Sequence, residues 1–333
     1  MFQNVNELSQ LQQMFDEGYI YIKQHQTAPL LIYNYTAKAQ YTRTWNETTM
    51  ACRGLITDLQ GNVVSRPFAK FFNLEEIDTL PDEPFTVTEK MDGSLAISFW
   101  IDGQMYVATR GSFDSPQSQW ANEWLKNNTP DIMLCSKYTY LFEILCHESR
   151  VVVHYGDRQE LVLLAVIETA TGEELPIDCW GFSTPRSFLT SNIKHLATMD
   201  WRNFEGFVVR FESGMRVKVK LAEYVRLHRL ISGINEKYVL DVLTKGDDLD
   251  QFIAGVPDEL YNWVKETAEK FRDQYKQIEG EAISLLNRTV ASTRREYAEA
   301  FKRFTYAPIL FSMLDGKDYK PLIWKYIAVN LSH

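Results

Sequence analysis

The chain has 333 residues, of which 45% are hydrophobic, 13% aromatic and 24% charged, and its formal net charge is −9. This composition is typical of a globular protein and excludes a disordered or fibrous chain. The longest apolar runs, such as residues 161–167, are too short to cross a bilayer, and the first residues show no pattern of a secretory signal. The acidic total argues against a broad coat of phosphate contacts but is compatible with a local basic groove.

The four cysteines, at positions 52, 135, 146 and 179, are widely spaced and form no Cys-x-x-Cys pair. Their spacing therefore predicts neither a zinc site nor a disulfide framework. We expect a protein of the reducing cytoplasm.

The first two thirds of the chain predict a sheet-rich body. Residues 6–23 have helical spacing, and short β-rich runs separated by turns follow from about residue 29 to residue 220. Two helices, at residues 117–127 and 185–193, interrupt these runs. This order predicts antiparallel sheets with peripheral helices, an α+β fold.

The strand patterns stop near residue 221, and the remaining chain reads as helical. Helices are predicted at residues 221–232, 236–244, 257–277, 279–304 and 309–314. The shift predicts two domains, residues 1–222 and residues 223–333. Residues 288–303 are locally basic, which is compatible with an RNA-facing helix, although a solvated helix face is the simpler interpretation.

The most informative stretch is residues 88–94, Thr-Glu-Lys-Met-Asp-Gly-Ser, at the end of a predicted strand. The Asp-Gly pair predicts a tight turn, so Lys90 would project from a rigid strand end. Taken alone, the motif is equally compatible with a solvated lysine beside a hairpin turn.

Other charged residues occur in strands where charge is unusual. Lys218 and Lys220 alternate with valine, so both ammonium groups point to one face, where they could bind a phosphate or simply solubilise an edge strand. Glu205 precedes an apolar strand, and Glu143 lies inside a hydrophobic run. Carboxylates in such settings are rarely left unpaired, and a structural salt bridge is the alternative account of Glu143.

The order of these motifs resembles the covalent nucleotidyltransferases, the superfamily of ATP-dependent ligases and RNA-capping enzymes. The nucleophile, third, fourth and fifth motifs of that superfamily are matched by residues 90–94, 142–143, 204–206 and 218–220. A narrower resemblance, to the ATP-dependent RNA ligase 1 type of phage T4, is carried by residues 51–54 (Ala-Cys-Arg-Gly), 65–67, 69–73 and 109–112 (Thr-Arg-Gly-Ser). It covers about residues 29–225. It implies a nucleotidyltransferase domain of ATP-grasp-like antiparallel sheets, followed by an all-helical C-terminal domain linked to tRNA recognition.

The resemblance implies a ligase that joins 5′-phosphate and 3′-OH ends of RNA with ATP and Mg²⁺ or Mn²⁺. Lys90 would attack the α-phosphate of ATP, expel pyrophosphate and form lysyl-AMP. AMP would then pass to the RNA 5′-phosphate, and the 3′-OH would attack the resulting RNA-adenylate to form a phosphodiester and release AMP.

The resemblance also implies a role for each matched residue. Lys218 and Lys220 would assist catalysis at the α-phosphate. Glu143 and Glu205 would face the ribose hydroxyls and the metal ion. Further nucleotide contacts would come from Arg53, Lys70, Arg110 and the backbone of Glu89. One departure from many relatives is that residues 161–168 contain no aromatic residue to stack on the adenine, so no stacking residue is predicted.

Three alternatives remain open. A DNA ligase or a capping guanylyltransferase would share the lysine chemistry, but both usually carry an OB-fold where this sequence predicts helices. A non-catalytic RNA-binding relative would not need all of the charged residues that match the motifs. The sequence has no GxxxxGK[ST] motif, so a separate kinase or phosphatase would have to prepare RNA ends, such as those of a broken tRNA.

Overall fold

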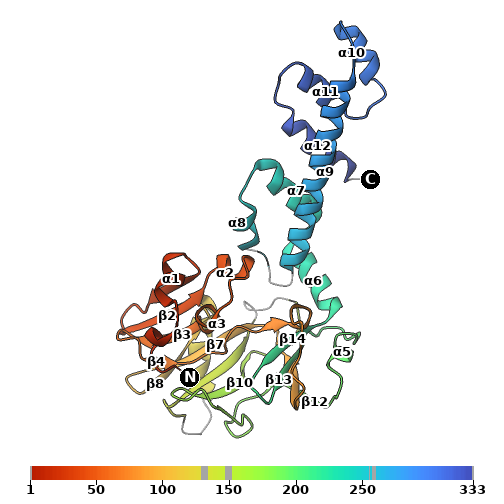
Figure 1. Cartoon of the computed structure of the whole chain (residues 1–333). Helices are drawn as coiled ribbons and strands as arrows, with labels where there is room; N and C mark the ends of the chain where they lie inside the picture. The colour runs from red at the N-terminus through yellow and green to blue at the C-terminus, as the bar shows by residue number, and fades with distance from the viewer. Residues whose placement is uncertain (1, 129–133, 147–151, 255, 257–259, 332–333) are drawn as a thin grey trace. The chain divides into compact units, whose positions relative to one another are not determined.

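The computed structural model describes residues 2–128, 134–146, 152–254, 256 and 260–331. The chain forms two compact units, Met1–Ile231 and Ser232–His333, and each is described by itself (Figure 1). The boundary falls later than the predicted one after residue 222, because helix α6 (Ala222–Ser232) buries Tyr224 in the core of the first unit. The α+β fold with antiparallel sheets and a helical C-terminal region is confirmed.

The first sheet has the strand order β1-β2-β3-β4, with bounds Ile20–Gln24, Leu30–Tyr35, Arg53–Asp58 and Val63–Ser65. The helix predicted over residues 6–23 is wrong in its length. A 3-10 turn (Val5–Glu7) and the short helix α1 (Leu11–Asp16) precede Gly18, whose φ of +73° ends the helical path. The following β-branched and aromatic residues form β1. Helices α2 (Ala37–Tyr41) and α3 (Glu47–Ala51) connect β2 to β3.

The second sheet has the strand order β11-β10-β9-β7-β8. The bounds, in that order, are Glu174–Leu175, Glu160–Glu168, Tyr138–Leu145, Ser94–Ile101 and Gln104–Thr109. One face packs against the first sheet through a core that contains Ile32, Ile56, Ile97 and Leu141. Helix α4 (Pro116–Asn128) covers a second core and forms where a helix is predicted.

The third sheet has the strand order β12-β6-β13-β14-β5. The bounds, in that order, are Ser187–Phe188, Phe85–Lys90, Gly206–Phe211, Arg216–Lys220 and Phe72–Asn73. Its pairs are antiparallel except β14 with β5. The helix predicted over residues 185–193 is wrong: edge strand β12 pairs with β6 there, and the short helix α5 (Ile193–Leu196) begins only at the end of that range.

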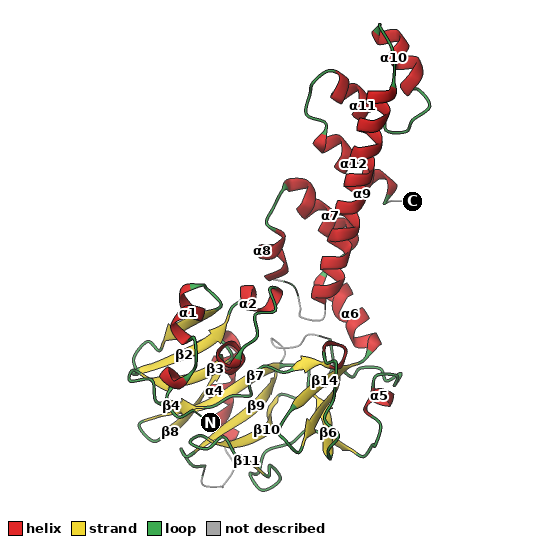
Figure 2. Ribbon diagram, in the orientation of Figure 1, coloured by secondary structure: helices red, strands yellow, loops and turns green. Residues whose placement is uncertain are grey.

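The second unit is helical. Its elements are α7 (Glu236–Lys245), α8 (Leu249–Ala254), α9 (Tyr261–Arg288), α10 (Arg294–Phe301), α11 (Ala307–Leu314) and α12 (Lys320–Asn330). Helix α9 contacts α7, α11 and α12, and Figure 2 shows it as one continuous helix. The break predicted near residue 278 is therefore wrong, and the break lies instead at residues 289–293, where Thr293 caps α10.

The start of the helix predicted at residue 257 lies outside the described residues. Within the described part of the chain, no helix has the length and apolar character needed to traverse a membrane.

The aromatic core of the third sheet should be the main source of stability near the predicted site. Phe207 is fully buried and its ring packs against Phe188, Trp201 and Phe204. We expect Phe207→Ala to lower the free energy of unfolding by roughly 3–5 kcal/mol, because it removes apolar burial and leaves a cavity. The matched control is Phe15→Ala, whose side chain is 44% exposed. Equal losses in urea unfolding of the two variants would contradict this account of the core.

Candidate active site

One buried carboxylate holds two lysines together. Glu205 lies directly before β13 and is 3% exposed, and its Oε1 atom accepts from Lys90 Nζ at 2.9 Å and from Lys220 Nζ at 3.2 Å. Lys90 is the last residue of β6, and Lys220 is the last residue of β14. Two of the three predicted catalytic lysines therefore share one anionic anchor.

The strand register explains this convergence. Gly206 in β13 pairs with Lys90 on one side and with Lys220 on the other. A Cβ atom at Gly206 would lie 2.0 Å from the Val219 carbonyl oxygen, so only glycine allows this close approach. The third lysine, Lys218, lies two residues before Lys220 in β14, and its ammonium group is 5.6 Å from the centroid of the Phe71 ring.

Glu143 is a second buried carboxylate near this group. It lies in β9 and pairs with Leu95 in β7 and Val162 in β10. Burial raises the pKa of the Glu143 carboxyl to about 7, although Lys90 and Arg53 act to lower it. Glu205 and Asp92 raise it further, so Glu143, Glu205 and Lys90 lie within one electrostatic environment.

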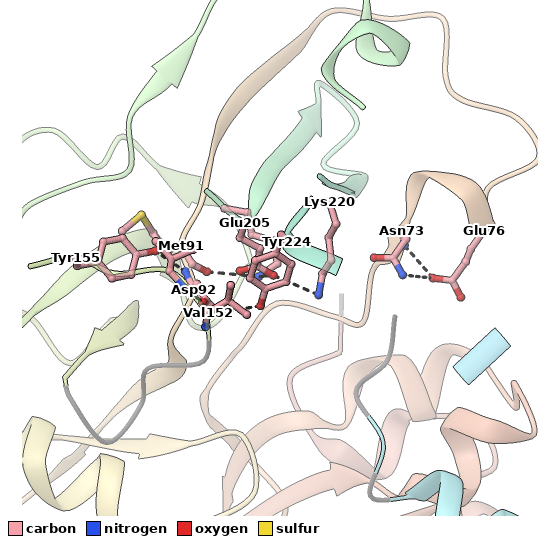
Figure 3. Close-up of polar contacts among 11 residues, drawn as sticks. Asn73, Glu76, Met91, Asp92, Val152, Tyr155, Glu205, Lys220 and Tyr224 are labelled. Atoms are coloured by element: carbon pink, nitrogen blue, oxygen red, sulfur yellow. Dashed lines mark hydrogen bonds and ion pairs between the residues drawn. The ribbon is translucent and has the colours of Figure 1, made fainter. Parts of the chain in front are cut away.

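Asp92 connects the turn behind Lys90 to two distant segments (Figure 3). Its Oδ2 atom accepts from the backbone N–H groups of Val152 at 2.8 Å and Val153 at 2.7 Å, and its Oδ1 atom accepts from the Tyr224 hydroxyl at 2.9 Å. The Asp92 N–H group donates to the Tyr155 hydroxyl at 2.7 Å. All these bonds orient the backbone that follows Lys90, so Asp92 is more than a turn-former.

Lys70 lies in an aromatic cage. It is buried, and its ammonium group is 5.1 Å from the ring centroid of Trp45, 5.7 Å from that of Tyr35 and 5.6 Å from that of Phe72. Such contacts attract a cation to the ring faces. Arg110, directly after β8, contacts one of the three rings of this cage. Its guanidinium group donates to the Tyr35 hydroxyl at 2.8 Å.

The remaining predicted residues lie close to these groups. Arg53, the first residue of β3, places its guanidinium 5.7 Å from the Phe71 ring, the same ring that Lys218 approaches. Glu89 precedes Lys90 in β6, and its carboxylate pairs with Arg186 at 2.6 Å. The Glu89 N–H group donates to the Arg186 carbonyl oxygen at 2.8 Å. A backbone contact from Glu89 to a nucleotide would therefore have to use its carbonyl oxygen.

Sequence reasoning missed several residues that shape this region. Tyr224, Tyr155 and Trp45 carry no charge and stand far from the motif they support, so no local pattern marks them. Arg186 was missed because its segment was assigned to a helix, which hid its position beside β6.

The raised pKa of Glu143 predicts a pH dependence of stability. Between its ordinary value of 4.5 and about 7, the folded chain holds a proton that the unfolded chain releases, so stability falls as pH rises through this window. Glu143→Gln removes this ionisation. At pH 8 we expect the free energy of unfolding of the variant to exceed that of the unmodified chain by on the order of 1–3 kcal/mol, and near pH 4.5 we expect no such difference.

This effect is measured by urea unfolding at both pH values in a chelating buffer. Glu123→Gln, on the exposed face of α4, is the control. If Glu143→Gln and the control change with pH in the same way, Glu143 is not held protonated by burial.

Comparison with known proteins gives an independent indication of family. The family profile described as RNA ligase matches residues 51–224. The chain is 25% identical over 286 residues to a protein of Thermovibrio ammonificans named as a candidate RNA ligase, covering 74% of this chain and 75% of that protein. It is 24% identical over 320 residues to an RNA ligase of Rhodothermus phage RM378, covering 71% of each.

A viral relative is longer than this chain. The similarity to a candidate bifunctional polynucleotide kinase/RNA ligase of Autographa californica nuclear polyhedrosis virus is 26% identity over 282 residues, covering 73% of this chain but 40% of the viral protein. The chain thus matches less than half of that protein's length.

Solved structures also show similarity at low identity. An archaeal ATP-dependent RNA ligase is 14% identical, covers 92% of this chain and 77% of its own, and has a TM-score of 0.46. A Naegleria gruberi RNA ligase with ATP and Mn is 15% identical, covers 44% of this chain and 52% of its own, and has a TM-score of 0.33. Because the family profile spans more than half of the sequence, this chain belongs to the RNA ligase family, of the phage T4 RNA ligase 1 type.

Proposed function

We propose that this chain is an ATP-dependent RNA ligase that joins 5′-phosphate and 3′-OH ends through lysyl-AMP on Lys90 and an RNA-adenylate. The observation that carries the proposal is the shared carboxylate of Glu205, which brings Lys90 and Lys220 to one atom. A nucleophilic amine and a phosphate-binding cation at one site are what attack on a phosphate requires. Membership of the RNA ligase family supports the same reaction.

In the first step, the Lys90 amine forms a bond to the α-phosphorus of ATP while the bond to the β-phosphate oxygen breaks and pyrophosphate leaves. The ammonium group must first lose a proton. Glu205 Oε1, 2.9 Å from Lys90 Nζ, is positioned to pass this proton on to water, so that Glu205 itself remains an anion. Lys220 and Lys218 then hold the α-phosphate oxygens and stabilise the charge that develops on them.

The outgoing phosphates are assigned to the more distant cations. Arg53, Lys70 and Arg110 form a second group of positive charge around the rings of Tyr35 and Phe71. The aromatic cage around Lys70 keeps its long side chain ordered, which reduces the entropy lost when a phosphate binds.

Glu143 and Glu205 fit a divalent cation such as Mg²⁺ or Mn²⁺. Carboxylate oxygens are the ligands that these ions prefer, and burial raises the pKa of the Glu143 carboxyl, so a divalent cation beside it would stabilise its anion. Within the part of the chain that the structure describes, no cluster of three metal-binding side chains occurs. Nucleotide phosphates and water would therefore complete the coordination. The ion would neutralise phosphate charge and polarise the phosphorus–oxygen bond.

The later steps need RNA and prepared ends. We assign RNA recognition to the helical unit, residues 232–333, and end healing to a separate kinase or phosphatase. The viral relative, named for both polynucleotide kinase and RNA ligase, supports such a pairing of activities. The four cysteines are free thiols, which supports the reducing cytoplasm as the place of action.

The proposal is tested by incubating the purified chain with a divalent metal ion and ATP labelled at the α-phosphate, after bound AMP has been removed. We expect label on the denatured chain, and we expect Lys90→Ala to abolish it because the variant lacks the amine to which AMP would be attached. Lys126→Ala is the matched control, since its side chain is 58% exposed on α4 and it should take label normally.

A parallel reaction uses labelled GTP. Label from GTP but not ATP would indicate capping chemistry, and label from neither would leave a non-catalytic RNA-binding protein. If Lys90 takes label from ATP, sealing of a nicked RNA against a nicked DNA then distinguishes an RNA ligase from a DNA ligase.

A further inference from the structure

The helical unit contains a cavity of about 470 Å³. Its main wall is one face of α9, which contributes Gln274, Gln277 and Glu281 at spacings of three and four residues. The opposite wall comes from α12 and the segment before α11, with Tyr326, Asn330 and Tyr306. The volume lies in the range of cavities that bind small organic groups.

The lining combines flat apolar surfaces with hydrogen-bonding groups. Ile278 contributes apolar surface beside the buried side chains of Phe271 and Ile327. The rings of Tyr306 and Tyr326 meet edge to face with centroids 6.1 Å apart. The side chains of Gln274, Gln277 and Asn330 offer both donors and acceptors. A planar ring with an apolar face and a polar edge is the ligand that such walls match.

The charges of the cavity exclude a phosphate group. Lys270, its one lining cation among the described residues, is paired with Glu236 at 3.3 Å. Glu281 accepts from the Gln277 side chain at 3.0 Å. Burial raises the pKa of the Tyr306 hydroxyl, and the negative charge of Glu281 raises it further. The excess of carboxylates favours a neutral ligand that donates hydrogen bonds.

Positive charge lies outside the cavity instead. Arg303 stacks on Phe304, with its guanidinium 5.1 Å from the ring centroid, and the Phe304 ring is 5.6 Å from that of Tyr306. Lys302 is also exposed. These cations could contact the backbone phosphates of a strand whose base enters the cavity, since phosphate contacts position RNA while base contacts select it.

We infer that this cavity binds one unstacked base of single-stranded RNA, with an exocyclic amino group directed at Glu281. Carboxylates accept from the amino group of cytosine, and unstacked bases are commonly held against aromatic side chains. The inference rests on the proposed function, because it makes the base part of the RNA that is sealed. It adds a preference for a cytosine-bearing strand over a uracil-bearing one.

The test measures the affinity of the full chain, without ATP, for short fluorescent oligo(C) and oligo(U) strands. Tyr326→Ala should weaken binding of both strands roughly 5- to 150-fold, the range for loss of one stacked base, whereas Tyr326→Phe should retain it. Glu281→Gln should abolish the preference for oligo(C). The controls are Tyr238→Ala, at an exposed tyrosine of α7, and Asp273→Asn, which makes the same charge change on α9 outside the cavity.

Circular dichroism shows whether Tyr326→Ala still folds. If it does not fold, Glu281→Gln still tests the inference, because Glu281 is exposed and its substitution leaves the fold intact. Binding by the variants that equals binding by their controls would overturn the inference and leave the cavity to a protein partner. The labelling of Lys90 in the unmodified chain decides the proposed function separately. If Lys90 takes label but the Tyr326 and Glu281 variants bind RNA like their controls, only the inference about the cavity is wrong. If Lys90 takes no label but these variants bind RNA differently from their controls, only the ligase reaction is wrong.

Discussion

The shared ion pair of Glu205 with Lys90 and Lys220 is the constraint on which the rest of the first unit depends. A carboxylate that is 3% exposed is costly to bury unless opposite charges and hydrogen bonds compensate it. The two lysines come from strands on either side of β13, so the compensation exists only when β6, β13 and β14 pair in the observed register. Because side chains alternate between faces, a slip of one residue would turn each lysine towards the aromatic core.

Much of the fold could be predicted because local patterns agree with tertiary structure. The alternation of Lys218 and Lys220 with valine does mark a strand with one charged and one buried face. The predictions failed where short elements depend on distant partners. Edge strand β12 has two residues and forms only because β6 lies beside it. The break between α9 and α10 lies at the cap formed by Thr293 rather than near residue 278, where it is predicted.

For the candidate site, the motif residues could be predicted because their charges stand out from apolar surroundings. Lys90, Glu205 and Lys220 do converge, and Lys218, Arg53 and Glu143 lie near them. What no pattern revealed is how these groups are held. The cage around Lys70 and the bond from Tyr224 to Asp92 join residues far apart in the sequence, and neither tyrosine nor tryptophan at those positions has a local signature of such a role.

The bond from Tyr224 to Asp92 also affects when the site can form during synthesis. The two residues are 132 positions apart, and chains grow at roughly 5–20 residues per second. Lys90 therefore leaves the ribosome about 7 to 26 s before the segment that fixes the turn behind it. Glu205 and Lys220 also emerge after Lys90, because they lie 115 and 130 positions further along the chain. The ion pairs of Lys90 can therefore form only after nearly the whole first unit has been made.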